Sequence, residues 1–246
     1  MALYVMADTH LSLATDKPMD VFGSRWMGYM TKLDNGWHDT VTDDDTVVIP
    51  GDVSWAMNFE QALDDMWYLD DLPGKKIISR GNHDYWWDTM TKLTALFKEN
   101  DIKTISLLFN NAYKVDNTII VGTRGWYTDA KLASSKNAPD NADYAKIVAR
   151  ESGRLRFSIE AGLKLRDASE TTGTGSRMTA FFHFPPVYRD YVCDEFVEIM
   201  REYGITRCYY GHIHGVYDIP PCRVYEGIEF IPVASDYLNF IPLRVN

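Results

Sequence analysis

Long apolar runs, basic stretches and cysteines are scarce in this sequence. No segment approaches the ~20 consecutive apolar residues that span a bilayer as a helix, and the opening residues MALYVMAD lack a basic region and a signal-peptide cleavage pattern. The three cysteines are odd in number and have none of the short spacings of zinc knuckles or disulfide frameworks; they are Cys193, Cys208 and Cys222. We therefore expect reduced thiols, a cytoplasmic location and no membrane partner.

Positive charge is also scarce. The chain has 25 lysines and arginines against 35 acidic residues, a formal net charge of −10, and no basic tract. Its long-range field repels nucleic acids and anionic membranes, which counts against either as a partner. A local cluster of metal ions can still bind phosphate, because the ions are then the largest nearby charges. Small phosphate-containing molecules therefore remain open as ligands.

Length and composition favour one α/β domain over residues 1–246. Hydrophobic residues make up 46% of the chain, which is enough for a large core, and no repeat or interdomain linker interrupts it. Buried strands are predicted at 2–7, 47–49 and 76–78, and helices at 20–39 and 58–71. This alternation is typical of a partly parallel sheet covered by helices.

Antiparallel strands are expected further along the chain. Short apolar runs lie between 104 and 121, with Asp116-Asn117 as a hairpin turn, so the sheet is predicted to be mixed. The remaining predicted elements are a charged helix at 140–168, a connector at 171–176, strands at 178–182 and 207–210, a helix at 190–203 and closing strands near 230–234.

Three conspicuous groups of residues are interpreted first as structural. The acidic run Asp43-Asp44-Asp45 precedes an apolar strand and favours a solvated turn. His38 lies near a helix end, where positive charge is favourable. Tyr85, Trp86 and Trp87 can stack on a base, but three aromatics opening a helix more often pack in a core.

Polar residues follow five of the predicted strands at the point where each strand ends. They are Asp8, Asp52, Asn82, His183 and His212. The carboxyl ends of strands in open α/β sheets are where ligands bind, so the fold would gather these residues. Five of the six histidines also lie at strand ends, and only His38 does not. So biased a placement favours a shared site.

The spacing of these residues suits metal ligation. Asp8-Thr9-His10 and His212-Ile213-His214 place two ligands on the same side of an extended segment. Imidazole is a ligand for transition metals, and a carboxylate can bridge two ions about 3.5–4 Å apart. The predicted ligand set is Asp8, His10, Asp52, Asn82, His183, His212 and His214. Its ligand types favour Mn, Fe, Co, Ni or Zn over Mg or Ca.

Taken in order, these motifs resemble those of the calcineurin-like metallophosphoesterases. They are Asp8-Thr9-His10, Gly51-Asp52, Gly81-Asn82-His83-Asp84, His183 and Gly211-His212-Ile213-His214. The resemblance implies a four-layer α/β/β/α sandwich with mixed sheets and two divalent metal ions. It implies that Asp8, His10, Asp52 and His214 hold one ion, that Asp52, Asn82, His183 and His212 hold the other, and that Asp52 bridges them.

The chain departs from some branches of that family. Val53-Ser54-Trp55-Ala56 follows Gly51-Asp52 where protein serine/threonine phosphatases have Asp-Arg-Gly, and Asp84 replaces their glutamate. No tyrosine lies close behind Asp52, where purple acid phosphatases have a ligand. The sequence looks nearer to the small bacterial phosphohydrolases and phosphodiesterases, so we expect a small phosphate ester as substrate.

The expected reaction is in-line attack on phosphorus by a hydroxide that bridges the two ions. His83 is predicted to protonate the leaving group, with Asp84 holding its imidazole in the useful tautomer. The alternative is that His83 only supports the neighbouring ligand. Arg124 follows a strand in a glycine-rich turn and is either a phosphate clamp or an ordinary surface arginine. Together with Asn82, it is the candidate substrate contact.

Two other functions are weighed against a small-molecule phosphomonoesterase or phosphodiesterase, for which a nucleotide is one possible substrate. A nuclease of the same fold conflicts with the charge of −10 and the lack of basic tracts. A non-catalytic protein-binding scaffold conflicts with the complete set of predicted ligands, because scaffold members are expected to have lost some. The substrate, the native metals and the oligomeric state are left open by the sequence.

Overall fold

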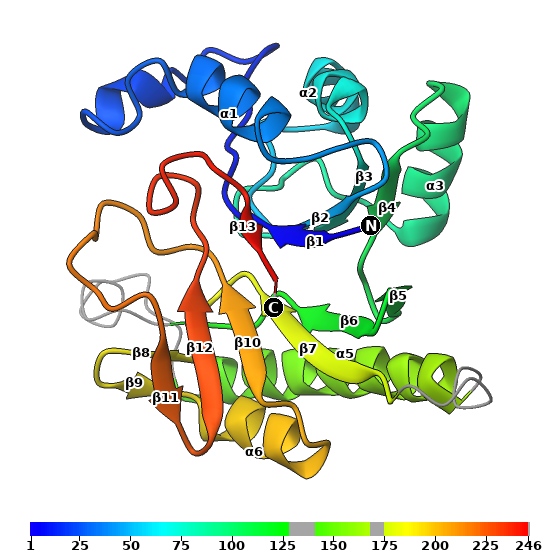
Figure 1. Cartoon of the computed structure of the whole chain (residues 1–246), viewed down its shortest axis with the longest axis vertical. Coiled ribbons are helices and arrows are strands. Elements are labelled where there is room, and N and C mark those ends of the chain that lie inside the picture. Colours follow the sequence, from blue (N-terminus) through cyan, green and yellow to red (C-terminus); the bar gives the residue numbers. More distant parts are fainter. Residues whose placement is uncertain (128–140, 168–174, 246) are drawn as a thin grey trace.

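The computed structural model describes residues 1–127, 141–167 and 175–245. Two sheets pack face to face between two layers of helices, as the four-layer prediction requires (Figure 1). The predicted connector at 171–176 lies mostly outside the described residues. No helix of the described part is both long and apolar enough to cross a bilayer.

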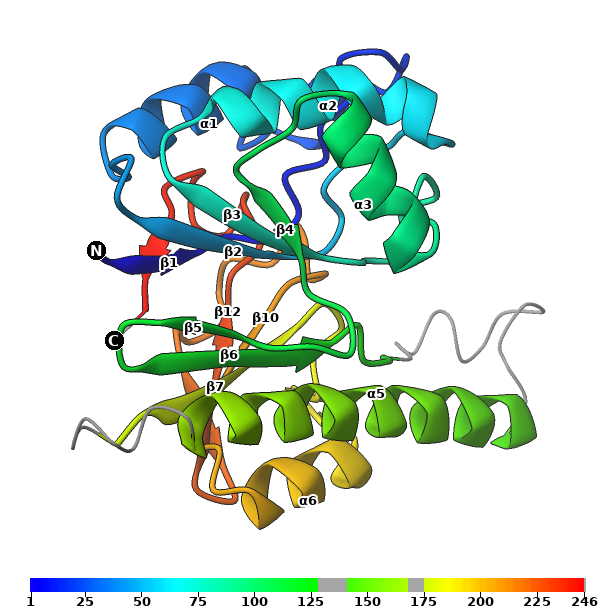
Figure 2. The same cartoon turned by 90° about the vertical axis from the view of Figure 1, so that its right-hand side faces the viewer.

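The first sheet is parallel except at one edge. Its order is β13 (Leu243–Arg244), β1 (Leu3–Val5), β2 (Thr46–Pro50), β3 (Lys75–Ser79) and β4 (Ile105–Leu107). Only β13 runs antiparallel to its neighbour. Its outer face is covered by α1 (Tyr29–His38), α2 (Phe59–Asp71) and α3 (Met90–Glu99) (Figure 2). The parallel order follows from the helical connections between its strands.

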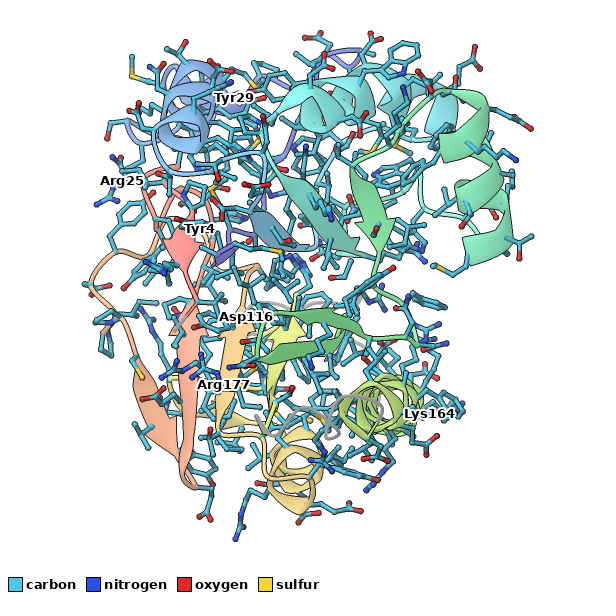
Figure 3. All side chains as sticks on the ribbon, turned by 45° about the vertical axis from the view of Figure 1, so that its right-hand side comes forward. Tyr4, Arg25, Tyr29, Asp116, Lys164 and Arg177 are labelled. Carbon is cyan, nitrogen blue, oxygen red and sulfur yellow. The ribbon has the colours of Figure 1, made fainter. Side chains whose placement is uncertain are left out.

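The second sheet has a parallel centre and antiparallel edges. Its order is β11 (Arg223–Tyr225), β12 (Ile228–Pro232), β10 (Arg207–Tyr210), β7 (Arg177–Phe182), β6 (Thr118–Thr123) and β5 (Tyr113–Val115). The outer face is covered by α5 (Asn141–Asp167) and α6 (Asp194–Glu202), and Lys164 points outward from α5 (Figure 3). A two-stranded sheet of β8 (Val187–Tyr188) and β9 (Tyr191–Val192) precedes α6.

Side chains that alternate between the two faces of each strand divide the hydrophobic core into three layers. In β2, Val48 faces the other sheet, whereas Val47 and Ile49 face the helices. In β7, Phe181 faces the first sheet, whereas Phe182 packs under α6. Both faces of these strands are buried, which is why they are nearly continuous apolar runs in the sequence. This packing fixes the strand ends, and therefore the loops that follow them.

Several sequence predictions were wrong at their boundaries. The helix predicted at 20–39 is a short 3-10 helix, η1 (Met19–Phe22), and then α1, because Gly23 and Gly28 have positive φ values of 118° and 63°. The helix predicted at 190–203 starts only at Asp194, after the β8–β9 hairpin.

Two of the structural interpretations were also partly wrong. Asp45 is not a solvated turn residue: it is 6% exposed and accepts hydrogen bonds from the backbone N–H groups of Ala2 and Thr42. The aromatic triplet does not open a helix, since α3 begins at Met90. Trp86 and Trp87 do pack in the core, as predicted.

Candidate metal centre

The five predicted strand-end residues gather at one end of the sandwich. Asp8, Asp52 and Asn82 follow β1, β2 and β3 of the first sheet, and His183 and His212 follow β7 and β10 of the second. Backbone hydrogen bonds tie the two sets of loops together: the N–H of Ala7, after β1, donates to the carbonyl of Val233, after β12, at 2.7 Å. The carboxyl ends of both sheets therefore meet, as the strand-end argument predicted.

The backbone is strained at four of the predicted ligands. Their φ values are positive: Asp8 60°, His10 46°, Asp52 51° and His212 70°. A left-handed conformation at a non-glycine residue costs on the order of 1–3 kcal/mol and persists only where the surroundings fix it. Here it turns side chains from three different loops, those after β1, β2 and β10, toward one site.

Two glycines allow the loops to approach the carboxylates closely. A Cβ atom on Gly81 would lie 2.1 Å from Asp52 Oδ1, and one on Gly211 would lie 2.5 Å from Asp8 Oδ2. Without a side chain at these positions, the backbone N–H groups of His83 and His212 can donate to Asp52 Oδ1 at 2.7 Å and to Asp8 Oδ2 at 2.9 Å. The glycines before Asn82 and His212 are therefore needed for this close packing.

The first group of ligand atoms comes from Asp8, His10 and His214, and all of them lie within 4.8 Å of one another. The Nε2 atoms of the two histidines face each other at 3.1 Å, and His214 Nε2 lies 3.5 Å from Asp8 Oδ1. That carboxylate oxygen is buried and has no hydrogen-bond partner among the described residues. Convergent nitrogens beside an orphaned oxygen are the arrangement that a cation would satisfy.

The second group comes from Asp52, His183 and His212, again with ligand atoms within 4.8 Å of one another. His183 Nε2 lies 3.5 Å from Asp52 Oδ2 and 2.7 Å from Asn82 Oδ1. Asp52 Oδ2 is also 3.8 Å from His10 Nε2, in the first group. Asp52 therefore lies between the two groups, in the place predicted for a bridging carboxylate.

The electrostatics of the two groups also fit divalent cations. Burial, together with the neighbouring histidines, holds the pKa of His10 and of His183 well below the ordinary value, so both rings are in the neutral form that binds metals. Burial raises the pKa of Asp52 well above its usual range, and the carboxylates of Asp84 and Asp8 add to that shift. Buried carboxylates packed this closely need compensating positive charge.

Asp236 supports the site and was missed from the sequence. Its Oδ1 lies 2.9 Å from Nδ1 of His214, and its Oδ2 accepts from the Gly215 N–H and the Tyr217 hydroxyl at 2.9 and 3.0 Å. A carboxylate on the second nitrogen of a ligating histidine fixes the tautomer and the orientation of the ring. Asp236 follows β12, so the strand-end rule applied to the tail could have found it.

Asp84 does not orient His83, contrary to the sequence prediction. Its two oxygens accept from the backbone N–H groups of Asp52, Val53, Ser54 and Gly81 at 2.7–3.2 Å and from the Trp86 indole at 3.1 Å. Nδ1 of His83 is buried and has no hydrogen-bond partner in the described part of the chain. The carboxylate accepts hydrogen bonds from the backbone of two loops, so it holds the loop containing Asp52 against the loop containing Gly81.

We expect Asp84→Asn to lower the free energy of unfolding by about 3 kcal/mol, because the amide turns a buried N–H₂ group toward N–H donors. Urea unfolding in the presence of a chelator measures the change separately from metal binding. Asp44→Asn, in an exposed turn, is the matched control and should leave the urea midpoint unchanged. An unchanged midpoint for Asp84→Asn would contradict this role.

His83 packs beside the ligands. Its ring lies 4.1 Å from the ring of Trp55 and 5.8 Å from that of His10, centre to centre. Burial, with the charges of His214 and Lys17, lowers the pKa of His83 to about 4, so the ring is neutral near pH 7 in the absence of substrate. The negative charge of a bound phosphate would favour the protonated ring.

The candidate substrate contact Arg124 and the sixth histidine, His38, lie outside both ligand groups. Arg124, after β6, has a side chain only 18% exposed, so it is not an ordinary surface arginine; its guanidinium carbon lies 6.0 Å from the centre of the Phe184 ring. His38 is the last residue of α1, and its Nδ1 lies 2.9 Å from the Asp34 carbonyl oxygen. His38 is therefore a helix-end residue, as the sequence indicated.

Comparison with known proteins agrees with this geometry. A family model described as calcineurin-like phosphoesterase matches residues 1–216. The protein TT1561 of Thermus thermophilus is a similar solved structure, with a TM-score of 0.57 and 10% identity over 96% of this chain and 91% of that one. A protein of unknown function from Aquifex aeolicus, AQ665, has a TM-score of 0.49 and 15% identity over 99% and 95%. No curated sequence matched. The likeness to TT1561 shows the fold alone.

Proposed function

Because the chain belongs to the calcineurin-like phosphoesterase family, and so is a metal-dependent hydrolase of phosphate esters, we propose that it cleaves a small phosphomonoester or phosphodiester. A nucleotide is one such ester. The observation that carries the proposal is the pair of ligand groups on either side of Asp52. The net charge of −10 supports a small substrate over a nucleic acid, whose phosphates the chain would repel.

In this proposal each ligand group holds one divalent cation drawn from Mn, Fe, Co, Ni or Zn. Asp8, His10, Asp52 and His214 would hold one ion, and Asp52, Asn82, His183 and His212 would hold the other. Two ions in such a site lower the pKa of a shared water and neutralise phosphoryl oxygens. The fixed loops supply the positioning, because Asp84 ties the Asp52 loop to the Gly81 loop and Asp236 orients His214.

His83 is the proposed proton donor to the leaving group. It follows Asn82 of the second ligand group directly, and its ring lies 5.8 Å from that of His10 in the first group, so it lies close to both groups. Its packing on Trp55 keeps the ring in place without a hydrogen bond to Nδ1 from any described residue. Proton donation by a positioned histidine is typically worth about 10²–10⁴-fold in rate.

The test combines metal analysis with turnover. The protein is chelated, reloaded with each cation in turn, analysed for bound metal and assayed on bis-p-nitrophenyl phosphate, p-nitrophenyl phosphate and a panel of phosphate metabolites. We expect two ions per chain and turnover only after reloading. A fully chelated protein that still hydrolyses the esters, or a reloaded protein that hydrolyses none, contradicts the proposal. Salt-dependent cleavage of DNA in preference to every small ester would point to a nuclease.

We also propose that residues 1–246 act as one unit in the cytoplasm. The ligands come from both sheets, so the site is complete only when the two sheets pack together. The three cysteines are unpaired and two of them are buried, which suits a reducing compartment. Fluorescence microscopy of the tagged protein in its host tests the location.

A further inference from the structure

A small arginine-lined cavity lies between β3, β6 and α5. Its volume is about 20 Å³, and its charged lining residues are Arg80, Arg124, Arg154 and Glu151. Arg80 follows β3, Arg124 follows β6, and the other two lie on α5. The lining therefore carries more positive than negative charge, although the chain as a whole is strongly acidic.

One buried carboxylate is shared among these arginines. Glu151 is fully buried and accepts hydrogen bonds from the Thr123 hydroxyl at 2.7 Å and from Arg154 Nη1 at 2.6 Å. Arg150, which lies outside the cavity, also donates from Nε to Glu151 Oε1 at 3.2 Å. Arg124 Nη2 lies 3.9 Å from the same oxygen. One carboxylate carries a single negative charge, so it does not neutralise the three arginines that line the cavity.

Several donors around the cavity have no partner among the described residues. The Nε atoms of Arg80 and Arg124 and the hydroxyl of Ser79 are buried without a hydrogen bond. Within the same part of the chain, Arg80 forms no hydrogen bond or ion pair. Unpaired buried donors are rare in folded proteins and indicate a missing ligand or water. Guanidinium groups in particular match the oxygens of phosphate.

This cavity adjoins the second ligand group. Arg80 directly precedes the Gly81-Asn82 segment, and the carbonyl of Arg124 accepts from the N–H of Phe184 at 2.8 Å. The Phe184 ring lies 4.9 Å from the ring of His183 and 4.4 Å from that of His212, centre to centre. A ligand that contacts the arginines therefore lies beside the proposed metal centre, on the side of Asn82 and His183.

We propose that Arg80, Arg124 and Arg154 form a subsite for a second phosphate group of the substrate, so that the preferred substrates are small molecules carrying two phosphates. The inference rests on the proposed function, since it assumes that the first phosphate sits at the metal centre. A volume of about 20 Å³ admits one or two atoms the size of a water oxygen. It takes the oxygens at the end of an anionic group and excludes a base or a sugar.

The experiment measures binding, so it does not depend on turnover. Alkane bisphosphonates with three to eight carbons, and the alkyl monophosphonates of the same lengths, are titrated calorimetrically into the Mn²⁺-loaded full chain. We expect one chain length at which the bisphosphonate binds at least tenfold more tightly than the monophosphonate of that length. This factor is counted after removing the twofold statistical advantage of a ligand with two equal ends. No preference at any length would overturn the subsite. If the protein prefers the bisphosphonate but hydrolyses no phosphate ester, only the proposed function is overturned.

Variants assign that preference to the cavity. We expect Arg80→Gln and Arg154→Gln each to reduce the bisphosphonate-to-monophosphonate affinity ratio at least tenfold. Arg156→Gln is the matched control on the same helix, because Arg156 is 41% exposed and pairs with Glu202 outside the cavity. Arg80 has no partner to lose among the described residues, so its substitution leaves the fold intact even if Arg154→Gln unfolds the chain. Equal ratios in Arg80→Gln and wild type would overturn the proposal.

The nature of the second anion is tested with ω-phosphonocarboxylic acids. In these compounds one end is a carboxylate of the same chain length. We expect them to bind like the monophosphonates, because a carboxylate brings less negative charge than a phosphonate dianion to the three guanidinium groups. A phosphonocarboxylate that matched the bisphosphonate would overturn the assignment to phosphate and point to a carboxylate instead.

Discussion

Asp52→Asn is expected to lose about 10³-fold or more in kcat. Asp52 Oδ2 lies within 3.8 Å of both His10 Nε2 and His183 Nε2, so this carboxylate can serve both ligand groups. The amide removes a negative charge and places a neutral N–H₂ or C=O between two cations, and a pair of ions contributes several kcal/mol of transition-state stabilisation. Bound metal should fall from two ions per chain to one or none.

The control for this substitution is Asp116→Asn. Asp116 has almost the same φ as Asp52, 49° against 51°, but it lies in the exposed turn between β5 and β6 (Figure 3). Asparagine tolerates positive φ, so backbone strain changes little in either variant. Elemental analysis and bis-p-nitrophenyl phosphate turnover are measured on both. If Asp52→Asn keeps two ions and normal turnover, the assignment of Asp52 as the bridge is wrong.

The gathering of the ligand residues could be predicted because it depends on strand ends. Val47–Ile49 and Ile77–Ile78 are buried apolar runs whose ends are marked by Pro50-Gly51 and Arg80-Gly81. Once strands are identified, parallel packing brings the residues that follow them to one edge. The same argument applies to Asp236, which follows β12.

What could not be predicted depends on contacts between distant segments. Asp84 follows His83 in the sequence, so a hydrogen bond between them is the obvious expectation; the carboxylate instead meets backbone donors 30–32 residues away. Asp45 likewise binds the N–H of Ala2, 43 residues away. Short-range sequence patterns carry no information about such hydrogen-bond partners, because these partners meet only when the sheets assemble.

The cavity beside Arg124 shows the same limit. The sequence is equally consistent with Arg124 as a phosphate clamp and as a surface residue. Its surroundings are set by Arg80, 44 positions earlier, and by Glu151 and Arg154 on α5. The arginine side chains that meet around Glu151, which no local pattern reveals, separate Arg124 from an ordinary surface arginine and motivate the second phosphate subsite.

His83→Ala is expected to slow the cleavage of alkyl phosphates by about 10²-fold or more while slowing p-nitrophenyl phosphate far less. An alkoxide leaves poorly unless it is protonated, whereas p-nitrophenolate leaves without help, so the difference isolates proton donation from binding. Because Nδ1 of His83 has no partner among the described residues and Asp84 is committed elsewhere, the ring is oriented by its packing on Trp55. His83→Asn, which fills part of the space but cannot donate as an acid, should resemble alanine.

The matched control is His38→Ala, at the one histidine outside the strand ends. This substitution should leave the hydrolysis rates of both substrates unchanged. Metal content is measured in all variants, since loss of an ion would slow both substrates equally. Equal slowing of alkyl and p-nitrophenyl esters by His83→Ala, with both ions retained, would mean that the histidine positions the phosphate and does not protonate the leaving group. In that case no other histidine near the site is free to donate the proton, because each of them is a proposed metal ligand.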